Sequence, residues 1–237
     1  MATKKQKRDR LARAEAERRE QERLAKRART VRTAAIGVGA VVVVAAVIFA
    51  ISWLNKDKPV VTPDAVTAQG GIAYPAANQA AADAVEVVVY EDPLCSHCRD
   101  FETDHGAYLQ KAADRGDISL EYRPIALISD DSVAPVNAMA CVLDDAGPKA
   151  FVEFHDRVFA GEYADSDFSD LANESGADGQ AVAACNDDGT HDGWVEKVTS
   201  DASDDGVEFT PTVRVNGETI DVDDLDDIET LIEEAAP

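Results

Sequence analysis

The sequence is poor in residues that usually build metal centres and aromatic binding surfaces. Its 237 residues include four cysteines, four histidines and two tryptophans, and aromatic side chains make up 6% of the chain. One Cys-x-x-Cys is present and there is no second, so a structural zinc site would lack two of the four ligands that it usually requires. We therefore expect no metal ion, unless a distant residue joins the pair.

Basic residues are scarce in most of the chain. Residues 1–32 hold 13 of the 23 Lys and Arg beside 5 acidic residues, whereas residues 33–237 hold 10 beside 41 acidic residues. The acidic part is expected to form a solvated surface, and its charge argues against nucleic acid as a partner. A chain divided in this way should lie in two different environments.

A long uncharged run separates the two parts. Residues 34–54, AAIGVGAVVVVAAVIFAISWL, would span roughly 30 Å as a helix, which matches a bilayer core. We predict one transmembrane helix over 33–54, which makes this a single-pass protein of the cell membrane. Its basic segment 1–32 would be cytoplasmic and the remainder extracytoplasmic. A cleaved signal peptide is the nearest alternative, although its apolar region is usually shorter, about 7–15 residues.

The rest of the chain divides into a linker and one folded domain. Pro59, Pro63 and Gly70 indicate a linker over 55–70, followed by a domain over 71–237. Within the domain, the run VEVVVY from Val85 predicts a buried strand, and a helix should follow it. The alternating segment ISLEYRPI predicts a second strand, parallel to the first, because strand–helix–strand units are usually parallel.

The second half of the domain begins with helices and ends with strands. Helix-forming segments separated by Asp-rich breaks predict an all-helical insert over about 128–203. The Asn216-Gly217 pair between two alternating runs predicts a β-hairpin, and an amphipathic helix should close the chain over 225–236. The expected fold is therefore α/β, with a helical insert between its strands.

The Cys95-Ser96-His97-Cys98 segment directly follows the first strand and opens the predicted helix. Free N–H groups and the helix dipole stabilise an anion at such a position, so Cys95 should have a lowered pKa and act as an exposed nucleophile. Cys98, in the first turn, should be the buried partner that resolves a mixed disulfide. His97 and Ser96 can favour the thiolate further. A purely structural disulfide is the alternative.

These segments resemble those of DsbA-like thioredoxin-fold thiol–disulfide oxidoreductases of the membrane-anchored, actinobacterial type. YEDPLCSHCRDF is similar to the family's active-site segment, and GVEFTPTVRVNG is similar to its cis-proline loop and hairpin. The resemblance covers about residues 70–237 and implies a thioredoxin-like fold with an inserted all-helical domain. It implies that Cys95 is the nucleophile, Cys98 the resolving cysteine, and Ser96 and His97 the dipeptide that tunes the potential. Thr210 and Pro211 would contact the substrate, with the bond between them cis rather than trans.

The resemblance also bears on the remaining cysteines. Cys141 and Cys185 lie on separate predicted helices of the insert, and a second, structural disulfide joins such a pair in some actinobacterial members. The alternatives are two free thiols or a second redox-active pair. Glu91 and Asp92 lie near the site and could shuttle protons, but their like charge beside Cys95 would disfavour a thiolate, so we expect them to be loop residues. His105, His155 and His191 have no ligand-like spacing, so we assign them no function.

The function that this implies is disulfide donation to secreted proteins outside the cytoplasm, with the Cys95–Cys98 disulfide as the redox centre and no further cofactor. The expected partners are unfolded or reduced secreted proteins and a membrane re-oxidising protein of the VKOR or DsbB type, and the protein is expected to be a monomer. A thiol reductase of the same fold, for instance in cytochrome c maturation, is one alternative. A non-redox binding module or metallochaperone is another.

Overall fold

The computed structural model describes residues 60–77, 80–161 and 168–237. The predicted cytoplasmic segment 1–32, the predicted transmembrane helix 33–54 and the first residues of the predicted linker lie outside these ranges. Among the residues described, no helix combines the length and the apolar character needed to cross a bilayer.

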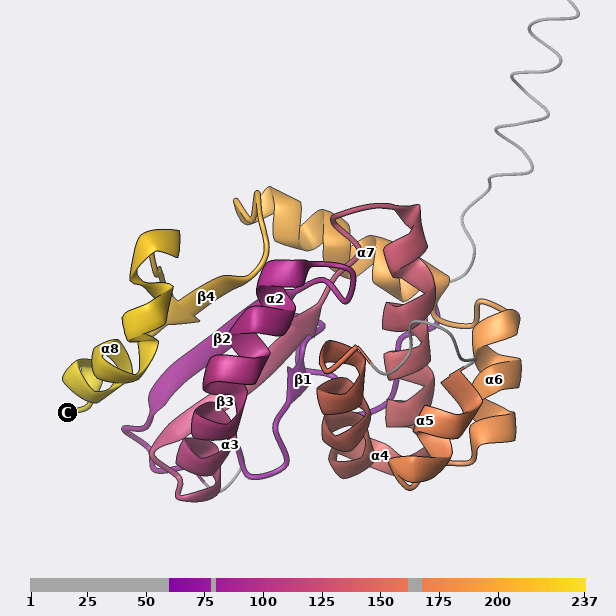
Figure 1. The fold of residues 1–237 in the computed structure, drawn as a ribbon, viewed down its shortest axis with the longest axis horizontal. Helices are drawn as coiled ribbons and strands as arrows, with labels where there is room; N and C mark the ends of the chain where they lie inside the picture. Colours follow the sequence, from indigo (N-terminus) through magenta and orange to yellow (C-terminus); the bar gives the residue numbers. More distant parts are fainter. Residues whose placement is uncertain (1–59, 78–79, 162–167) are drawn as a thin grey trace, which may run out of the picture. The chain divides into compact units, whose positions relative to one another are not determined.

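A five-stranded sheet forms the centre of the fold (Figure 1). Its strands stand in the order β1-β3-β2-β4-β5, and β2 and β3 are parallel, whereas the other pairs are antiparallel. The predicted parallel pair is therefore confirmed. The bounds of the strands are Ile72–Ala73 for β1, Val85–Glu91 for β2, Ile118–Pro124 for β3, Thr212–Val215 for β4 and Glu218–Thr219 for β5.

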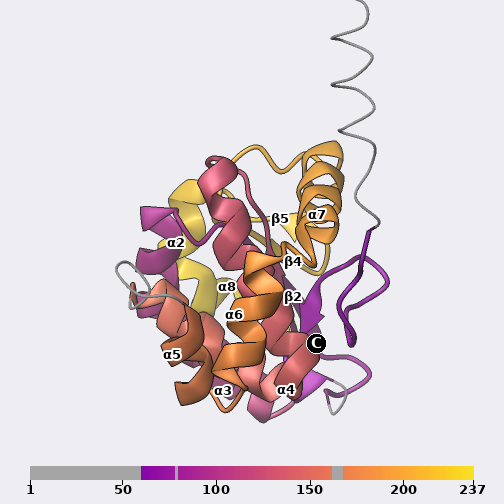
Figure 2. The same ribbon diagram turned by 90° about the vertical axis from the view of Figure 1, so that its right-hand side faces the viewer.

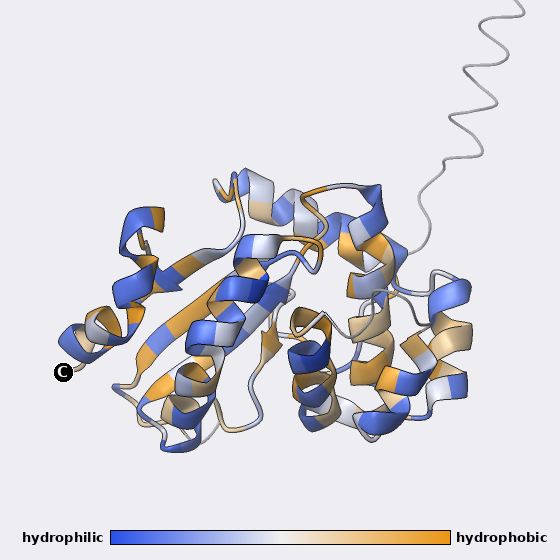
Figure 3. Ribbon diagram, in the orientation of Figure 1, coloured by the Kyte–Doolittle hydropathy of each residue, from blue (hydrophilic) through white to orange (hydrophobic). Residues whose placement is uncertain are grey.

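The central strand β2 is hydrophobic on both faces, because helices cover both (Figure 3). Val89 pairs with Tyr122 of β3 and shares its face of the sheet with Glu91, two residues further on. Tyr90 and its partner Arg123 point to the opposite face. Tyr90 receives hydrogen bonds there from Arg123 and Arg214. The end of β2 therefore presents a carboxylate to one layer and a tyrosine to the other.

One long helical stretch crosses from β2 to β3. It consists of α2 (Ser96–Phe101), a π-helical turn η2 (Glu102–Gly106) and α3 (Ala107–Asp114). Figure 1 shows this stretch lying over the sheet. The stretch is the single helix that the sequence predicts, except for the wider turn at its middle. Near the C-terminus, η4 (Val222–Asp227) leads into α8 (Ile228–Ala235), which packs beside α3 through a hydrogen bond from Tyr108 to the carbonyl of Glu229.

In the described part of the connection from β3 to β4 there are helices and no strand, as the sequence predicts. The short η3 (Asp130–Ser132) precedes α4 (Val133–Phe159), whose two halves meet at a kink at Gly147, with φ +81°, before Pro148. The positive φ of Gly147 and the missing N–H of Pro148 account for the kink. Figure 2 shows α4 packed with α5 (Phe168–Glu174) and α6 (Gly179–Asp187), while α7 (Asp192–Asp204) leads back to the sheet.

The Asn216-Gly217 hairpin is confirmed. Both residues have positive φ, 50° and 83°, which is the backbone conformation of a two-residue turn between twisted strands. The side-chain oxygen of Asn216 also accepts a hydrogen bond from the N–H of Glu86, so the turn is fixed to β2. The hairpin thereby holds β4 in register beside β2, with Val213 opposite Val89.

Candidate active site

The loop between β2 and α2 is organised by one buried carboxylate. Asp92 accepts hydrogen bonds from the N–H of Leu94 at 2.8 Å, from that of Leu127 at 2.7 Å and from that of Ile128 at 2.8 Å. Its backbone carbonyl accepts one from the N–H of Cys95. Asp92 is a loop residue, as predicted, and it ties the start of α2 to the segment that follows β3, whereas the same prediction is wrong for Glu91, the last residue of β2.

Cys95 is the N-cap residue of α2. Its φ and ψ are extended, −76° and 119°, and no side chain caps the first N–H groups of the helix. The backbone N–H groups of His97 and Cys98 act on the sulfur instead, as predicted. Cys95 is only 6% exposed, however, so the expectation of an openly exposed nucleophile is wrong. Cys98, one turn on, is fully buried, and both cysteines are free thiols in this structure.

The Thr210–Pro211 peptide bond is cis, and it lies against Cys95. The Cys95 Sγ atom is 3.2 Å from the carbonyl oxygen of Thr210, although 115 residues separate the two in sequence. Pairing of β4 with β2 places them together, because Thr212 stands opposite Tyr90 at the end of both strands. The structure therefore brings Cys95, Cys98, Thr210 and Pro211 to one place.

The surroundings of Cys95 favour its thiolate. A hydrogen bond from the Cys98 thiol is the strongest influence and, against the opposing effect of burial, it lowers the pKa of Cys95 to about 5. The Thr210 side chain and the backbone N–H groups of Cys98 and His97 contribute further. The pKa of Cys98, by contrast, is raised. Burial is the main cause, followed by the hydrogen bond between Cys98 and Cys95 and by the negative charge of Glu91. The two thiols are thus strongly differentiated.

Ser96 and His97 have exposed side chains between the two cysteines. His97 acts on Cys95 through its backbone N–H. The imidazole, which the sequence suggested as the direct donor, lies in solvent, and the position of the residue at the helix start supplies the hydrogen bond. Further along, Phe209, directly before Thr210, and Ile128, whose N–H is held by Asp92, are large apolar side chains exposed by 45% and 55%.

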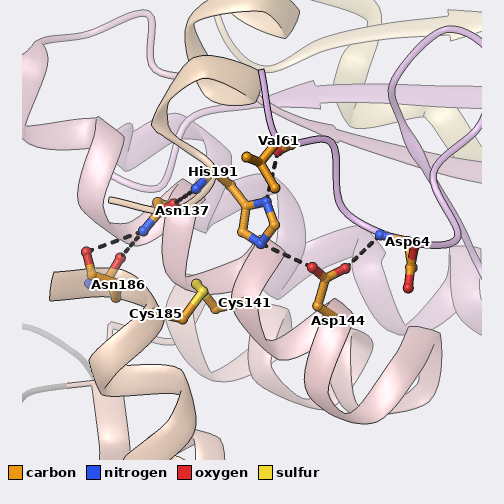
Figure 4. Close-up of a disulfide and its surroundings, with 8 residues drawn as sticks. All are labelled: Val61, Asp64, Asn137, Cys141, Asp144, Cys185, Asn186 and His191. Atoms are coloured by element: carbon orange, nitrogen blue, oxygen red, sulfur yellow. Dashed lines mark hydrogen bonds and ion pairs between the residues drawn. A yellow bond between two sulfur atoms is a disulfide. The ribbon is translucent and has the colours of Figure 1, made fainter. Parts of the chain in front are cut away.

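Cys141 and Cys185 form a disulfide in the structure, between α4 and α6 (Figure 4). Asn137, one turn before Cys141, accepts a hydrogen bond from the N–H of His191 and donates to Asn186, so it ties α4 to the ends of α6 and α7. This second pair belongs to the helical insert and contributes no atom to the Cys95 site.

The described part of the predicted linker is attached to the same region of the insert. The carbonyl of Val61 lies 2.9 Å from His191 Nδ1, and the N–H of Asp64 donates to the carboxylate of Asp144. Nε2 of His191 lies 3.1 Å from Asp144. These residues of the linker are therefore fixed on α4 and α7.

Sequence reasoning missed a buried acid–base cluster beneath Cys98. Glu91 and His155 are both fully buried, with Glu91 Oε1 2.6 Å from His155 Nε2, and Glu102 of the π-helical turn adjoins them. Two patterns in the sequence could have revealed it. Glu91 continues the inward positions of β2 after Val87 and Val89, and His155 lies four residues from each of Phe151 and Phe159.

A low-pKa thiolate at a helix start, a buried second thiol and a facing cis-proline on a thioredoxin-like sheet define a thiol–disulfide oxidoreductase. Residues 78–234 match the model of a family described as Thioredoxin, so the chain belongs to this thioredoxin family. It is a DsbA-like protein-disulfide oxidoreductase within it.

Solved structures of such oxidoreductases resemble this one. The MdbA protein, a thiol-disulfide oxidoreductase from Actinomyces oris, superposes with a TM-score of 0.63 and is 24% identical; the match covers 77% of this chain and 92% of that one. BdbD from Bacillus subtilis has a TM-score of 0.60 at 24% identity, with 73% and 97% covered. DsbA from Mycobacterium tuberculosis has a TM-score of 0.54 at 27% identity, with 66% and 89% covered. None of the curated protein sequences matches the chain.

Proposed function

We propose that this oxidoreductase donates disulfides to secreted proteins outside the cytoplasm. The observation that carries the proposal is the Cys95 sulfur at the start of α2, with its pKa lowered to about 5 and with Thr210 of the cis-proline loop against it. Stabilising the thiolate stabilises the reduced enzyme, so the disulfide form becomes the stronger oxidant. At neutral pH such a pKa makes the pair more oxidising by on the order of 50 mV than an unperturbed thiol would.

Each site residue has a role in this cycle. A substrate thiolate attacks the Cys95 sulfur of the Cys95–Cys98 disulfide, and Cys98 is released. Ser96 and His97 tune the potential through their place at the helix start. Thr210 and Pro211 position the extended substrate beside Cys95, and a second substrate thiol then completes the transfer.

Two apolar side chains favour unfolded polypeptides as substrates. Phe209 and Ile128 are exposed close to the active site. Phe209 directly precedes Thr210 in the chain, and the backbone N–H of Ile128 donates a hydrogen bond to Asp92. Large apolar groups exposed next to a reactive site usually serve binding. An unfolded chain offers both the cysteines and the hydrophobic residues that this arrangement suits, whereas a folded protein buries them.

The setting follows from the sequence. The uncharged run 34–54 anchors the enzyme in the cell membrane as a single helix, with residues 1–32 in the cytoplasm. A membrane protein of the VKOR or DsbB type re-oxidises the pair. The enzyme works as a monomer without a cofactor beyond its own disulfide, and Cys141–Cys185 has a structural role.

The reduction potential of the Cys95–Cys98 pair, measured in redox buffers, tests the direction of the reaction. We expect a value near the oxidising end of the family, about −120 mV, rather than near the value of thioredoxin, about −270 mV. The expected result supports donation of disulfides. A value near −270 mV would establish a reductase, and a pair that does not cycle, or that holds a metal ion tightly, would establish a binding module.

A further inference from the structure

The buried cluster beneath Cys98 continues toward the surface of the protein. His155 Nε2 lies 2.6 Å from Glu91 Oε1, and the other ring nitrogen, Nδ1, lies 3.2 Å from the carboxylate of Asp156. Asp156 is 46% exposed, whereas Glu91 and His155 are fully buried. Three side chains therefore make an unbroken line of hydrogen bonds from Glu91, whose charge acts on Cys98, to solvent.

Buried acidic groups gather around Glu91. Burial, the charge of Glu91 and a hydrogen bond between the two carboxyl groups raise the pKa of Glu102 well above its usual value, and the buried hydroxyl of Tyr122 adjoins both acids. Side-chain oxygen and nitrogen atoms of Glu91, Glu102 and His155 lie within 4.8 Å of one another. Burying two carboxyl groups side by side is costly unless one of them holds a proton, so this cluster indicates a function.

The geometry favours a proton over a metal ion. Two atoms that bind one zinc ion at about 2.0–2.2 Å in a tetrahedral arrangement stand more than about 3 Å apart. The 2.6 Å between Glu91 and His155 is shorter and matches a charge-assisted hydrogen bond with a proton between the two atoms.

The ring of His155 is held by packing. Rings of Tyr122, Phe159 and Phe151 lie around it, with centroids 4.3, 4.7 and 5.7 Å away. Beside it, a pocket of about 230 Å³ is lined by Glu102, Asp156 and other residues of η2, α3 and α4. The Glu102 carboxylate lies against Gly106, where a Cβ would stand 2.5 Å from its Oε2, so a larger residue there would displace it. The middle of the line, His155, and the adjoining Glu102 are thus fixed in position.

Thiol–disulfide exchange requires a proton at Cys98. When a substrate thiolate attacks Cys95, the Cys95–Cys98 bond breaks and its electron pair leaves on Cys98, which then takes up one proton. The second substrate thiolate attacks the substrate sulfur of the mixed disulfide and releases Cys95 as a thiolate. The substrate loses two protons and Cys98 gains one, so one proton reaches the solvent. Cys98 is fully buried, and water alone is a poor source for its proton.

We propose that His155 is a proton-relay residue, which passes protons between the exposed Asp156 and the buried Glu91 and so supplies Cys98 during disulfide exchange. The proposal rests on the disulfide exchange assigned to Cys95 and Cys98 above. When the enzyme oxidises its substrate, Glu91 gives a proton to the Cys98 thiolate that leaves the disulfide. His155 then gives its proton to Glu91, and His155 takes up a new proton from solvent through Asp156. Re-oxidation of the enzyme runs the same line in reverse. Glu102, beside Glu91, is a second store for the proton.

The charged groups around His155 set the pH dependence. Titratable groups that face the cluster come from β2, η2, β3, α2 and α4: Glu91, Glu102, Tyr122, Cys98 and Asp156. Burial alone would lower the pKa of His155, but the charge and hydrogen bond of Glu91 outweigh it and raise the pKa well above its usual value. His155 therefore keeps its proton through neutral pH and loses it at higher pH. Over the neutral range, transfer should change little with pH while the relay is intact.

Single-turnover transfer to a reduced two-cysteine peptide tests the relay. The oxidised enzyme is mixed with the peptide at a series of pH values, and the reaction is quenched with acid. Free thiols are then alkylated, and mass spectrometry measures how many thiols each molecule carries. We expect His155→Gln to slow the release of Cys98 by about tenfold or more, with a rate that falls as the pH rises, since general acid catalysis contributes at least that factor. The matched control is His191→Gln, which removes a buried, hydrogen-bonded histidine of the insert.

The outcomes separate this proposal from the proposed function. If both histidine variants follow the wild-type profile within about twofold, the relay is overturned and disulfide exchange stands. If the wild type itself transfers nothing, both fall. One equivalent of a divalent metal in the purified protein, removed by Glu102→Gln, would also overturn the relay.

A surface variant gives a second test that does not depend on the folding of His155→Gln. Asp156→Asn changes a half-exposed residue, and its amide cannot pass on a proton. We expect transfer to slow several-fold and to recover when imidazole buffer is added, because a small acid can reach the pocket beside Glu102. A rate that neither falls nor responds to buffer contradicts the relay.

Discussion

The two cysteine pairs of this domain occupy opposite positions on their helices. Cys95 is the N-cap residue of α2, where no side chain competes for the free N–H groups, whereas Cys185 lies in the last turn of α6. The start of α6 is already capped, because Asp178 accepts hydrogen bonds from the N–H groups of Gln180 and Ala181. A thiolate gains from the first position and not from the second. The position of a cysteine on its helix therefore decides its chemistry. One pair is the redox centre, and the other is a disulfide that joins two helices.

The largest effect is expected when the reactive cysteine of the first pair is removed. Cys95→Ala should abolish disulfide transfer to a reduced peptide, since Cys95 alone among the four cysteines, all of them in the described ranges, stands at a helix start beside the cis-proline loop. The rate should fall by about three orders of magnitude or more, as when a covalent nucleophile is removed. The double variant Cys141→Ala/Cys185→Ala is the control and should still transfer. Activity retained by Cys95→Ala would contradict its assignment as the nucleophile.

The second prediction concerns the acidity of Cys95. Alkylation by iodoacetamide should depend on a group with pKa about 5, so the reduced enzyme should react nearly fully at pH 7 and lose reactivity below pH 5. The sign follows from a lowered pKa: the thiolate is present above it and is protonated as the pH falls through it. In Cys98→Ala the midpoint should rise, because the hydrogen bond from Cys98 is the largest contribution. An unchanged midpoint would mean that the helix start alone sets the pKa.

The third prediction acts on the other pair. Reducing Cys141–Cys185, or replacing both cysteines with alanine, should lower the free energy of unfolding by about 3–4 kcal/mol, because the bond closes a long loop with a sequence separation of 44 residues. Chemical denaturation of the reduced and oxidised forms measures this. The midpoint of Cys95 alkylation should stay in place, since α4 and α6 contribute nothing to its hydrogen bonds. A shifted midpoint would show that the two pairs communicate.

Sequence patterns were sufficient for the parallel pair β2 and β3, the hairpin and the helical insert, because each depends on local periodicity or on turn residues such as Asn216 and Gly217; the two-residue β1 is too short to show a periodicity. The Cys95 site was predictable for a similar reason, since strand, loop and helix start are consecutive in the chain. Glu91 was misjudged as a loop residue, and the role of Asp92 in holding its loop was missed, because their partners lie far away in sequence, at His155 and at Ile128. Only tertiary packing brings these residues together, so a single sequence contains their inward positions but not their contacts.

The smallest effect is expected when the cap at the start of α6 is removed, which tests why the starts of α2 and α6 differ. Asp178→Ala should cost about 1 kcal/mol of stability, because two N–H groups of the first turn lose their acceptor. A chemical denaturation curve would detect it, and Asp178→Asn, which keeps a capping oxygen, should recover most of the loss. Transfer by Cys95 should be unchanged in both variants. This contrast isolates the physical cause of the difference between the pairs: the N–H groups at the start of α6 are already bound by a capping carboxylate, while those at the start of α2 are left for a sulfur anion. If Asp178→Ala changed the rate of transfer by Cys95, the helical insert and the active site would be coupled.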